Sequence, residues 1–126
     1  MITLDFDSHY SRRNKRQLSA NFALDSYNRM HNDKPKRQIE IWISPSRNGF
    51  HLVRYGDDGT LRNEIKLRLL YGDDLTRIAI DKYKLSIGSS NHNVLWNDKY
   101  GKRAKKIRLG QLKRFARGET IDKVIG

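Results

Sequence analysis

The stretch Ile39 to Tyr55, IEIWISPSRNGFHLVRY, predicts a two-stranded β-hairpin. Apolar residues recur at every second position on both sides of a short loop that contains Gly49. This period of two is typical of strands that bury one face. We expect the apolar face to lie in the core, and the opposite face to display Glu40, Trp42, His51, Val53 and Tyr55.

Length and charge limit the kinds of protein that this chain can be. With 126 residues it has room for one domain with a modest core. Its 26 Lys and Arg outnumber its 14 Asp and Glu, which gives a net charge of +12 and favours polyanions, nucleic acid first, as partners. No apolar run approaches the roughly 20 residues of a membrane-spanning helix, so we expect no membrane partner.

The absence of cysteine and the character of the first residues exclude further classes of protein. The chain has no cysteine, which removes disulfides, thiolate catalysis and cysteine-ligated zinc. Its first residues, MITLDFDSHY, lack the basic and apolar regions of a secretory signal. We therefore expect a cytoplasmic protein, located in the host cytoplasm if its source is viral.

The order of periodic segments predicts the fold class. The strand-like segments are 2–6, the two arms of the hairpin and 93–96, and the helix-like segments are 20–30, 61–69, 75–83 and 109–116. The order indicates an α+β fold, a four-stranded antiparallel sheet with helices on one face, in the βαββαβ arrangement of ferredoxin-like or RRM-like domains plus a C-terminal helix. Residues 1–98 would form this core, and 99–126 a basic tail with a helix in the same domain.

The paired helices after the hairpin have their own pattern. Gly72 is expected to end the first of them, and Asp73-Asp74 to cap the second. In the second helix Leu75, Ile78, Ala79 and Tyr83 are predicted to share one apolar face. We expect the two helices to pack together as one broken unit.

Two carboxylates on the first strand are candidate metal ligands. Asp5 and Asp7 lie two residues apart, so both project from the face of the sheet that carries Glu40. Paired carboxylates can hold Mg²⁺ or Mn²⁺ against phosphates, with Glu40 as a third oxygen ligand. The alternative is that both aspartates are solvated at the strand end, or that Asp7 caps the next helix.

Asp5-Phe6-Asp7 and the segment from Ser46 to His51 form two short motifs that resemble those of the archaeo-eukaryotic primase superfamily. Asp5-Phe6-Asp7 matches the family's metal-binding strand, and Ser46, Gly49 and His51 match a Ser-Gly-x-Gly-x-His segment that holds the phosphates of a nucleotide. Arg47 stands where the first glycine of that segment is usual. The resemblance implies a reduced RRM-type domain with Asp5, Asp7 and His51 as catalytic residues and Mg²⁺ or Mn²⁺ as the cofactor.

Aromatic residues give the same sheet face a second interpretation. Trp42 and Tyr55 are predicted to lie on adjacent central strands, where the aromatic side chains of RRM-like sheets stack on bases. Such stacking contributes about 1–3 kcal/mol of binding free energy per base. Alternatively, the C-terminal helix or the partner of a homodimer covers Trp42.

A dense cluster of positive charge follows the last predicted strand. We expect these cations to contact a phosphate backbone, since with no acid among them they would otherwise repel one another. The predicted nucleic-acid-binding residues are Lys99, Lys102, Arg103, Lys105, Lys106, Arg108, Lys113, Arg114 and Arg117, together with Arg47, Trp42 and Tyr55.

These observations predict a small nucleic-acid-binding protein, with DNA favoured over RNA, that serves replication or genome maintenance of a mobile element or virus. The basic tail would bind phosphates, and the exposed sheet face would bind bases or a nucleotide. The enzymatic alternative is a metal-dependent, primase-like nucleotidyltransferase or nuclease that uses Asp5 and Asp7. The third class is a structural packaging protein that binds duplex non-specifically.

Overall fold

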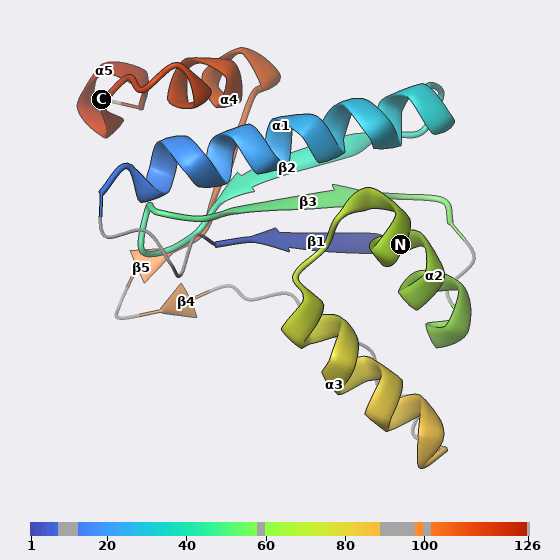
Figure 1. The fold of residues 1–126 in the computed structure, drawn as a ribbon. Helices are drawn as coiled ribbons and strands as arrows, with labels where there is room; N and C mark the ends of the chain where they lie inside the picture. The colour runs from blue at the N-terminus through green and yellow to red at the C-terminus, as the bar shows by residue number, and fades with distance from the viewer. Residues whose placement is uncertain (8–12, 58–59, 89–97, 100–101, 126) are drawn as a thin grey trace.

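A computed structural model describes residues 1–7, 13–57, 60–88, 98–99 and 102–125. Figure 1 shows the arrangement of the elements. In chain order they are β1 (Ile2–Phe6), α1 (Lys15–Asp33), β2 (Ile39–Ile43), β3 (Phe50–Arg54), α2 (Leu61–Tyr71), α3 (Leu75–Ser86), β4 (Asp98–Lys99), β5 (Lys102–Arg103), β6 (Lys105–Ile107), α4 (Leu109–Ala116) and α5 (Ile121–Val124).

The main sheet has four antiparallel strands in the order β1-β3-β2-β6, and β4 pairs with β5 as a separate hairpin. The predicted α+β class and the β2–β3 hairpin are therefore confirmed. The predicted βαββαβ arrangement is wrong in two respects. Two helices, α2 and α3, separate β3 from the strands that follow, and the last strand of the sheet lies beside β2 instead of β1.

The fourth strand comes from the segment that was expected to be a basic tail. The predicted strand 93–96 lies outside the described residues, and β6 fills the fourth place in the sheet. Ile107 pairs with Ile41 and is only 5% exposed. A strand of three residues with one apolar side chain has no detectable period, so the pattern of the sequence could not reveal it.

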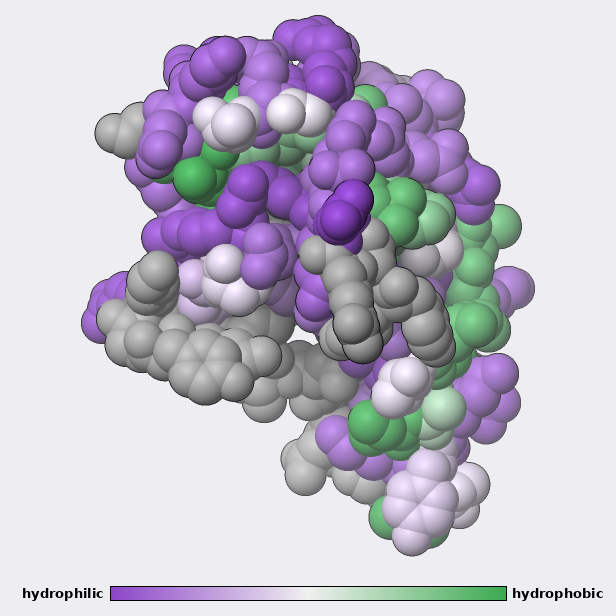
Figure 2. Space-filling model, turned by 60° about the vertical axis from the view of Figure 1, so that its left-hand side comes forward, coloured by the Kyte–Doolittle hydropathy of each residue, from purple (hydrophilic) through white to green (hydrophobic). Residues whose placement is uncertain are grey.

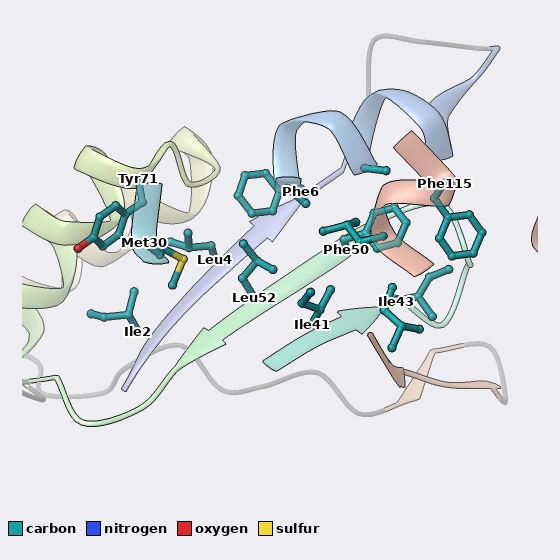
Figure 3. Close-up of a cluster of buried hydrophobic side chains, with 14 of the residues drawn as sticks. Ile2, Leu4, Phe6, Met30, Ile41, Ile43, Phe50, Leu52, Tyr71 and Phe115 are labelled. Carbon is teal, nitrogen blue, oxygen red and sulfur yellow. The ribbon is translucent and has the colours of Figure 1, made fainter. Parts of the chain in front are cut away.

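One face of the sheet carries the core. Ile41 pairs with Leu52, and Leu52 pairs with Leu4, so that apolar side chains form continuous rows across the strands (Figure 3). Helix α1 covers these rows with the buried residues Ala20, Ala23 and Met30, and Leu24 and Tyr27, which recur with them at helical spacing, pack against the core partly buried. The remaining buried members of the core are Ile2, Phe6, Ile43, Phe50, Tyr71, Ile107, Leu112, Phe115 and Val124.

The C-terminal helix α4 lies on this apolar face beside α1 (Figure 1). The ring of Phe115 packs against Phe50, with 5.6 Å between the ring centroids. Leu112 is fully buried in the same cluster. The helix therefore does not cover the polar face of the sheet, which was one of the two explanations considered for Trp42.

Helices α2 and α3 form a hairpin that packs through Ile65, Ile78 and Leu85. Gly72 ends α2 in a left-handed conformation, and the Asp74 side chain caps α3 by accepting hydrogen bonds from the amides of Thr76 and Arg77. Both predictions for this turn are confirmed. Of the four residues predicted to share a face of α3, only Ile78 is buried, while Leu75 is 72% and Tyr83 65% exposed.

The loop between β2 and β3 needs a glycine at its last position. A Cβ atom on Gly49 would lie 2.9 Å from the backbone oxygen of Phe6 in β1. The Gly49 amide also donates a hydrogen bond to Ser44 Oγ at 3.0 Å, which fixes the loop against the end of β2.

We predict that Gly49→Ala lowers the free energy of unfolding by about 1–3 kcal/mol, because the added methyl group must displace a strand backbone. The matched control is Gly110→Ala on α4, where a Cβ has no neighbouring atom within 4 Å. Because Gly110 lies in the first turn of α4, that change should not lower the free energy of unfolding. Urea denaturation of both variants measures the difference, and equal stabilities would contradict the close packing of Gly49.

Candidate functional site

The polar face of the sheet gathers several of the predicted site residues. The register of the strands aligns Asp5, His51, Trp42 and Lys106 in one row from β1 to β6. The period-two alternation predicted that the first three of them share a face. It gave no sign that Lys106 would join them, because that residue was assigned to a tail.

This face is not open along its whole width. Val53 is fully buried and His51 is 6% exposed, whereas Trp42 is half-buried. Tyr55, just beyond β3, is 40% exposed. Strand β3 therefore offers no exposed surface on which a base could stack, and the accessible aromatic side chains are Trp42 on β2 and Tyr55 just beyond β3.

His51 is a buried partner of Asp5. Its Nδ1 atom lies 2.8 Å from the Asp5 carboxylate, and its side chain is only 8% exposed. Burial lowers the pKa of His51 below the ordinary value, although the nearby Asp5 carboxylate acts in the opposite direction. A neutral imidazole held in this way positions Asp5, and it does not present a cation on the surface.

Glu40 has other partners than the two aspartates. Its carboxylate lies 2.8 Å from Lys106 Nζ and accepts a short hydrogen bond from the Tyr55 hydroxyl. The hydrogen bond from Lys106, followed by that from Tyr55, lowers the pKa of Glu40. Strand β3 separates Glu40 from β1, so the structure does not bring Glu40 together with Asp5 and Asp7.

Aspartates from the α2–α3 turn lie beside β1 instead. Asp5 and Asp7 line a pocket of about 330 Å³ together with Asp73 and Asp74. The Asp73 carboxylate accepts a hydrogen bond of 2.7 Å from the Asp5 amide and is itself buried. Sequence reasoning interpreted Asp73-Asp74 as a helix cap only, and nothing in the local pattern connects this pair with β1.

Ion pairs already occupy part of this pocket wall. Asp73 pairs with Arg68 at 2.7 Å and with Arg77 at 3.1 Å. Burial raises the pKa of Asp73 above its ordinary value, while the cations oppose this shift, with Arg77 first. Among the described residues, no group of three or more His, Cys, Asp or Glu has the geometry of a metal site.

The loop before His51 has an unusual residue at its bend. Arg47 adopts a left-handed backbone with φ of 64°, a conformation that favours glycine. Its guanidinium donates hydrogen bonds to the backbone oxygens of Ser44 at 3.1 Å and Arg103 at 2.8 Å. Arg47 thus ties the loop to β5, while Ser46 remains exposed.

The members of the predicted basic cluster lie on β4, β5, β6 and α4. Lys99 and Lys102 lie on β4 and β5, and the other members follow from Arg103 to Arg117. The ion pairs found for them are Lys106 with Glu40, and Arg114 and Arg117 with Glu119. Within the part of the chain that the structure describes, Lys105, Arg108 and Lys113 have no ion-pair partner.

Four of these cations line one groove. It has a volume of about 550 Å³ and is lined by Arg108, Gly110, Gln111, Lys113, Arg114 and Arg117. A Cβ atom at Gly110 would have no neighbour within 4 Å, so the helix backbone is accessible at this point. No acidic residue of the described segments lines the groove, which makes it suited to an anion.

Comparison of the chain with protein families, with curated proteins and with solved structures found no match. Among the described residues, no helix combines the length and the apolar character required to cross a membrane.

We predict that the buried imidazole makes stability depend on pH. In the unfolded chain His51 binds a proton near its ordinary pKa of about 6.5, whereas the folded protein binds it only at lower pH. The contribution of His51 to the free energy of unfolding is therefore fully present above a pH of about 6.5, and it is lost as the pH falls below this value.

The variant His51→Asn keeps an N–H donor toward Asp5 but does not titrate. Chemical denaturation of both proteins between neutral and mildly acidic pH should show that the wild type loses more stability than the variant on acidification. Parallel curves for the two proteins would contradict the lowered pKa.

Proposed function

We propose that this protein binds nucleic acid by holding the phosphate backbone on the basic surface of α4, which is formed by Arg108, Lys113, Arg114 and Arg117. The observation that carries the proposal is the groove on α4, which four cations and no described acid line. Two of its members, Lys113 and Arg117, are exposed on the same helix face, and Arg117 is 67% exposed. Phosphate contacts of this kind supply most of the affinity of non-specific binding.

The polar face of the sheet, opposite to the face that α4 covers, offers a second contact. Trp42 is half-buried and pairs with Lys106 across the β2–β6 ladder, so an indole and a cation adjoin each other at the sheet edge. A base stacked on Trp42 would place its phosphate near Lys106. A stacking contact of this kind favours single-stranded nucleic acid over duplex as the ligand.

We predict that Lys113→Gln/Arg117→Gln weakens binding and reduces its salt dependence. Each lost phosphate contact should reduce the slope of log K against log salt by about 0.7–0.9. Fluorescence anisotropy of labelled single-stranded and duplex oligonucleotides, DNA and RNA, at several salt concentrations measures both quantities. Lys66→Gln/Lys82→Gln removes the same charge from exposed positions on α2 and α3 and should leave binding nearly unchanged.

Two outcomes would count against the proposal. Equal losses in the two double variants would show that net charge alone attracts the nucleic acid, without a defined surface. Equal affinity for single strand and duplex that is insensitive to Trp42→Ala would remove the stacking contact and favour the packaging alternative.

A second candidate function rests on the acidic pocket. Asp5, Asp7, Asp73 and Asp74 line it together, and His51 holds Asp5 in place. Two carboxylates two residues apart could contribute oxygen ligands to Mg²⁺ or Mn²⁺, which would polarise a phosphate for nucleotidyl transfer or phosphodiester cleavage. Asp5 and Asp7 are the residues that would hold the ion, since Asp73 is already paired with two arginines.

This candidate predicts that calorimetric titration with Mn²⁺ in the presence of a nucleotide gives a saturable signal in the wild type. The signal should disappear in Asp5→Asn/Asp7→Asn, whereas Asp25→Asn, at an exposed ion pair on α1, should retain it. Wild-type protein that gives no signal would remove the enzymatic candidate, and it would leave the phosphate surface on α4 unaffected.

A further inference from the structure

The α2–α3 hairpin presents a groove that neither the core nor the basic surface uses. Figure 1 shows α3 extending away from the sheet. The face of the hairpin that lies inside contains a small apolar cluster of Ile65, Ile78 and Leu85, beside the buried pair of Arg68 and Asp81. Much of the remaining apolar surface of the hairpin is therefore exposed, as the protruding lower part of Figure 2 shows.

The groove runs between the two helices and has a volume of about 480 Å³. From α2 it is lined by residues at helical positions i, i+3, i+4 and i+7, and from α3 by positions i, i+3 and i+4, so each helix contributes one continuous face. The lining residues are Arg62, Ile65, Lys66 and Leu69 from α2, and Lys82, Leu85 and Ser86 from α3.

Chemically, the groove combines an apolar floor with basic rims. Ile65, Leu69 and Leu85 form the floor, and Leu69 remains 44% exposed. The exposed cations Arg62 and Lys66 stand on one rim, and Lys82 on the other. No acidic residue within the described segments lines the groove, so its charge is not balanced locally.

We propose that this groove is the docking site for an acidic amphipathic helix of a partner protein. An apolar stripe at i, i+3, i+4 and i+7 would fill the floor, and carboxylates on both sides of the stripe would meet the basic rims. Burial of Leu69 and of the accessible part of Leu85 supplies affinity, while the charges select the partner and its orientation.

Other occupants fit the groove less well. A second copy of this chain would bring a net charge of +12 toward a basic surface, which is unfavourable. Nucleic acid would match the charges, but the floor is aliphatic, and no aromatic side chain lines it for stacking. An acidic helix satisfies the apolar floor and the cations together.

A different apolar stripe on α3 supplies the control. Ile80, Tyr83 and Ile87 are 49%, 65% and 61% exposed, and they do not line the groove. A peptide that adheres to any exposed apolar surface would use this stripe as readily as the groove.

The experiment uses a fluorescein-labelled peptide of about 16 residues, long enough to form a helix, with leucines at i, i+3, i+4 and i+7 and glutamates on both flanks. Anisotropy with the full chain should show saturable binding that salt weakens. Lys66→Glu/Lys82→Glu should reduce the affinity at least about tenfold. Ile80→Ser and Lys113→Gln/Arg117→Gln should leave the affinity unchanged, and thermal melts should confirm that every variant is folded.

Several results would overturn the docking site. These are no saturable binding by the wild type, equal binding of a peptide whose glutamates are replaced by glutamine, equal binding by the charge-reversed variant, or loss of binding in Ile80→Ser. An unlabelled oligonucleotide that displaces the peptide from Lys113→Gln/Arg117→Gln as well as from the wild type would assign the groove to nucleic acid instead. Because the nucleic-acid variants lie on α4, failure of one proposal does not imply failure of the other.

Discussion

A single buried guanidinium connects the sheet with the helices that cover it. Arg54, the last residue of β3, is fully buried and donates hydrogen bonds to Asp57, to the Tyr71 hydroxyl and to the Met30 carbonyl oxygen. It also lies over the Tyr71 ring, 4.8 Å from its centroid, and Tyr71 donates a hydrogen bond to Asp33. Burial alone would lower the pKa of Arg54, but the hydrogen bonds with Asp57 and Tyr71 outweigh it and raise the pKa. Because removal of one partner from such a buried pair typically costs about 3–5 kcal/mol, the placement of α1 and α2 depends on this residue.

A second buried network attaches the α2–α3 hairpin to the edge of the sheet. Arg68 bridges Asp73 and Asp81, at 2.7 and 2.5 Å, and Asp73 accepts a hydrogen bond from the backbone of β1. Arg77 adds a hydrogen bond of 3.1 Å to Thr3 Oγ1. These ion pairs attach the hairpin to the edge of the sheet, in addition to the apolar contacts of Tyr71 with the core and of Ile65, Ile78 and Leu85 within the hairpin.

The two networks also influence where the net positive charge of the protein lies. The buried pairs are formed by one arginine and one or two aspartates each, so they contribute little to the net charge of +12. The excess of cations lies on exposed residues, with one concentration on β6 and α4 and a smaller one along the rims of the α2–α3 groove. The acidic pocket between β1 and the α2–α3 turn is the opposite case, because there the same networks bring carboxylates together. Because several aspartates are used in the buried ion pairs, the exposed cations on α4 and along the α2–α3 groove are left largely without acidic neighbours, and these are the surfaces proposed for nucleic acid and for a partner helix.

The sequence by itself determined the local elements. Alternation fixed the β2–β3 hairpin and the shared face of Asp5, His51 and Trp42, and the helical spacing of Ala20, Ala23 and Met30 fixed the buried face of α1. These features depend on the geometry of the backbone over a few residues, which the order of side chains expresses directly. The tertiary structure alone decided the rest. It selected Lys105–Ile107 as the fourth strand, placed α4 on the apolar face, buried Asp81 and brought Asp73 to β1. Each of these features depends on a contact between different elements of the structure, such as Arg68 with Asp81 or Ile107 with Ile41. The local periodicity of the sequence does not indicate which distant residue will neutralise a buried charge or which segment will pair with a sheet edge.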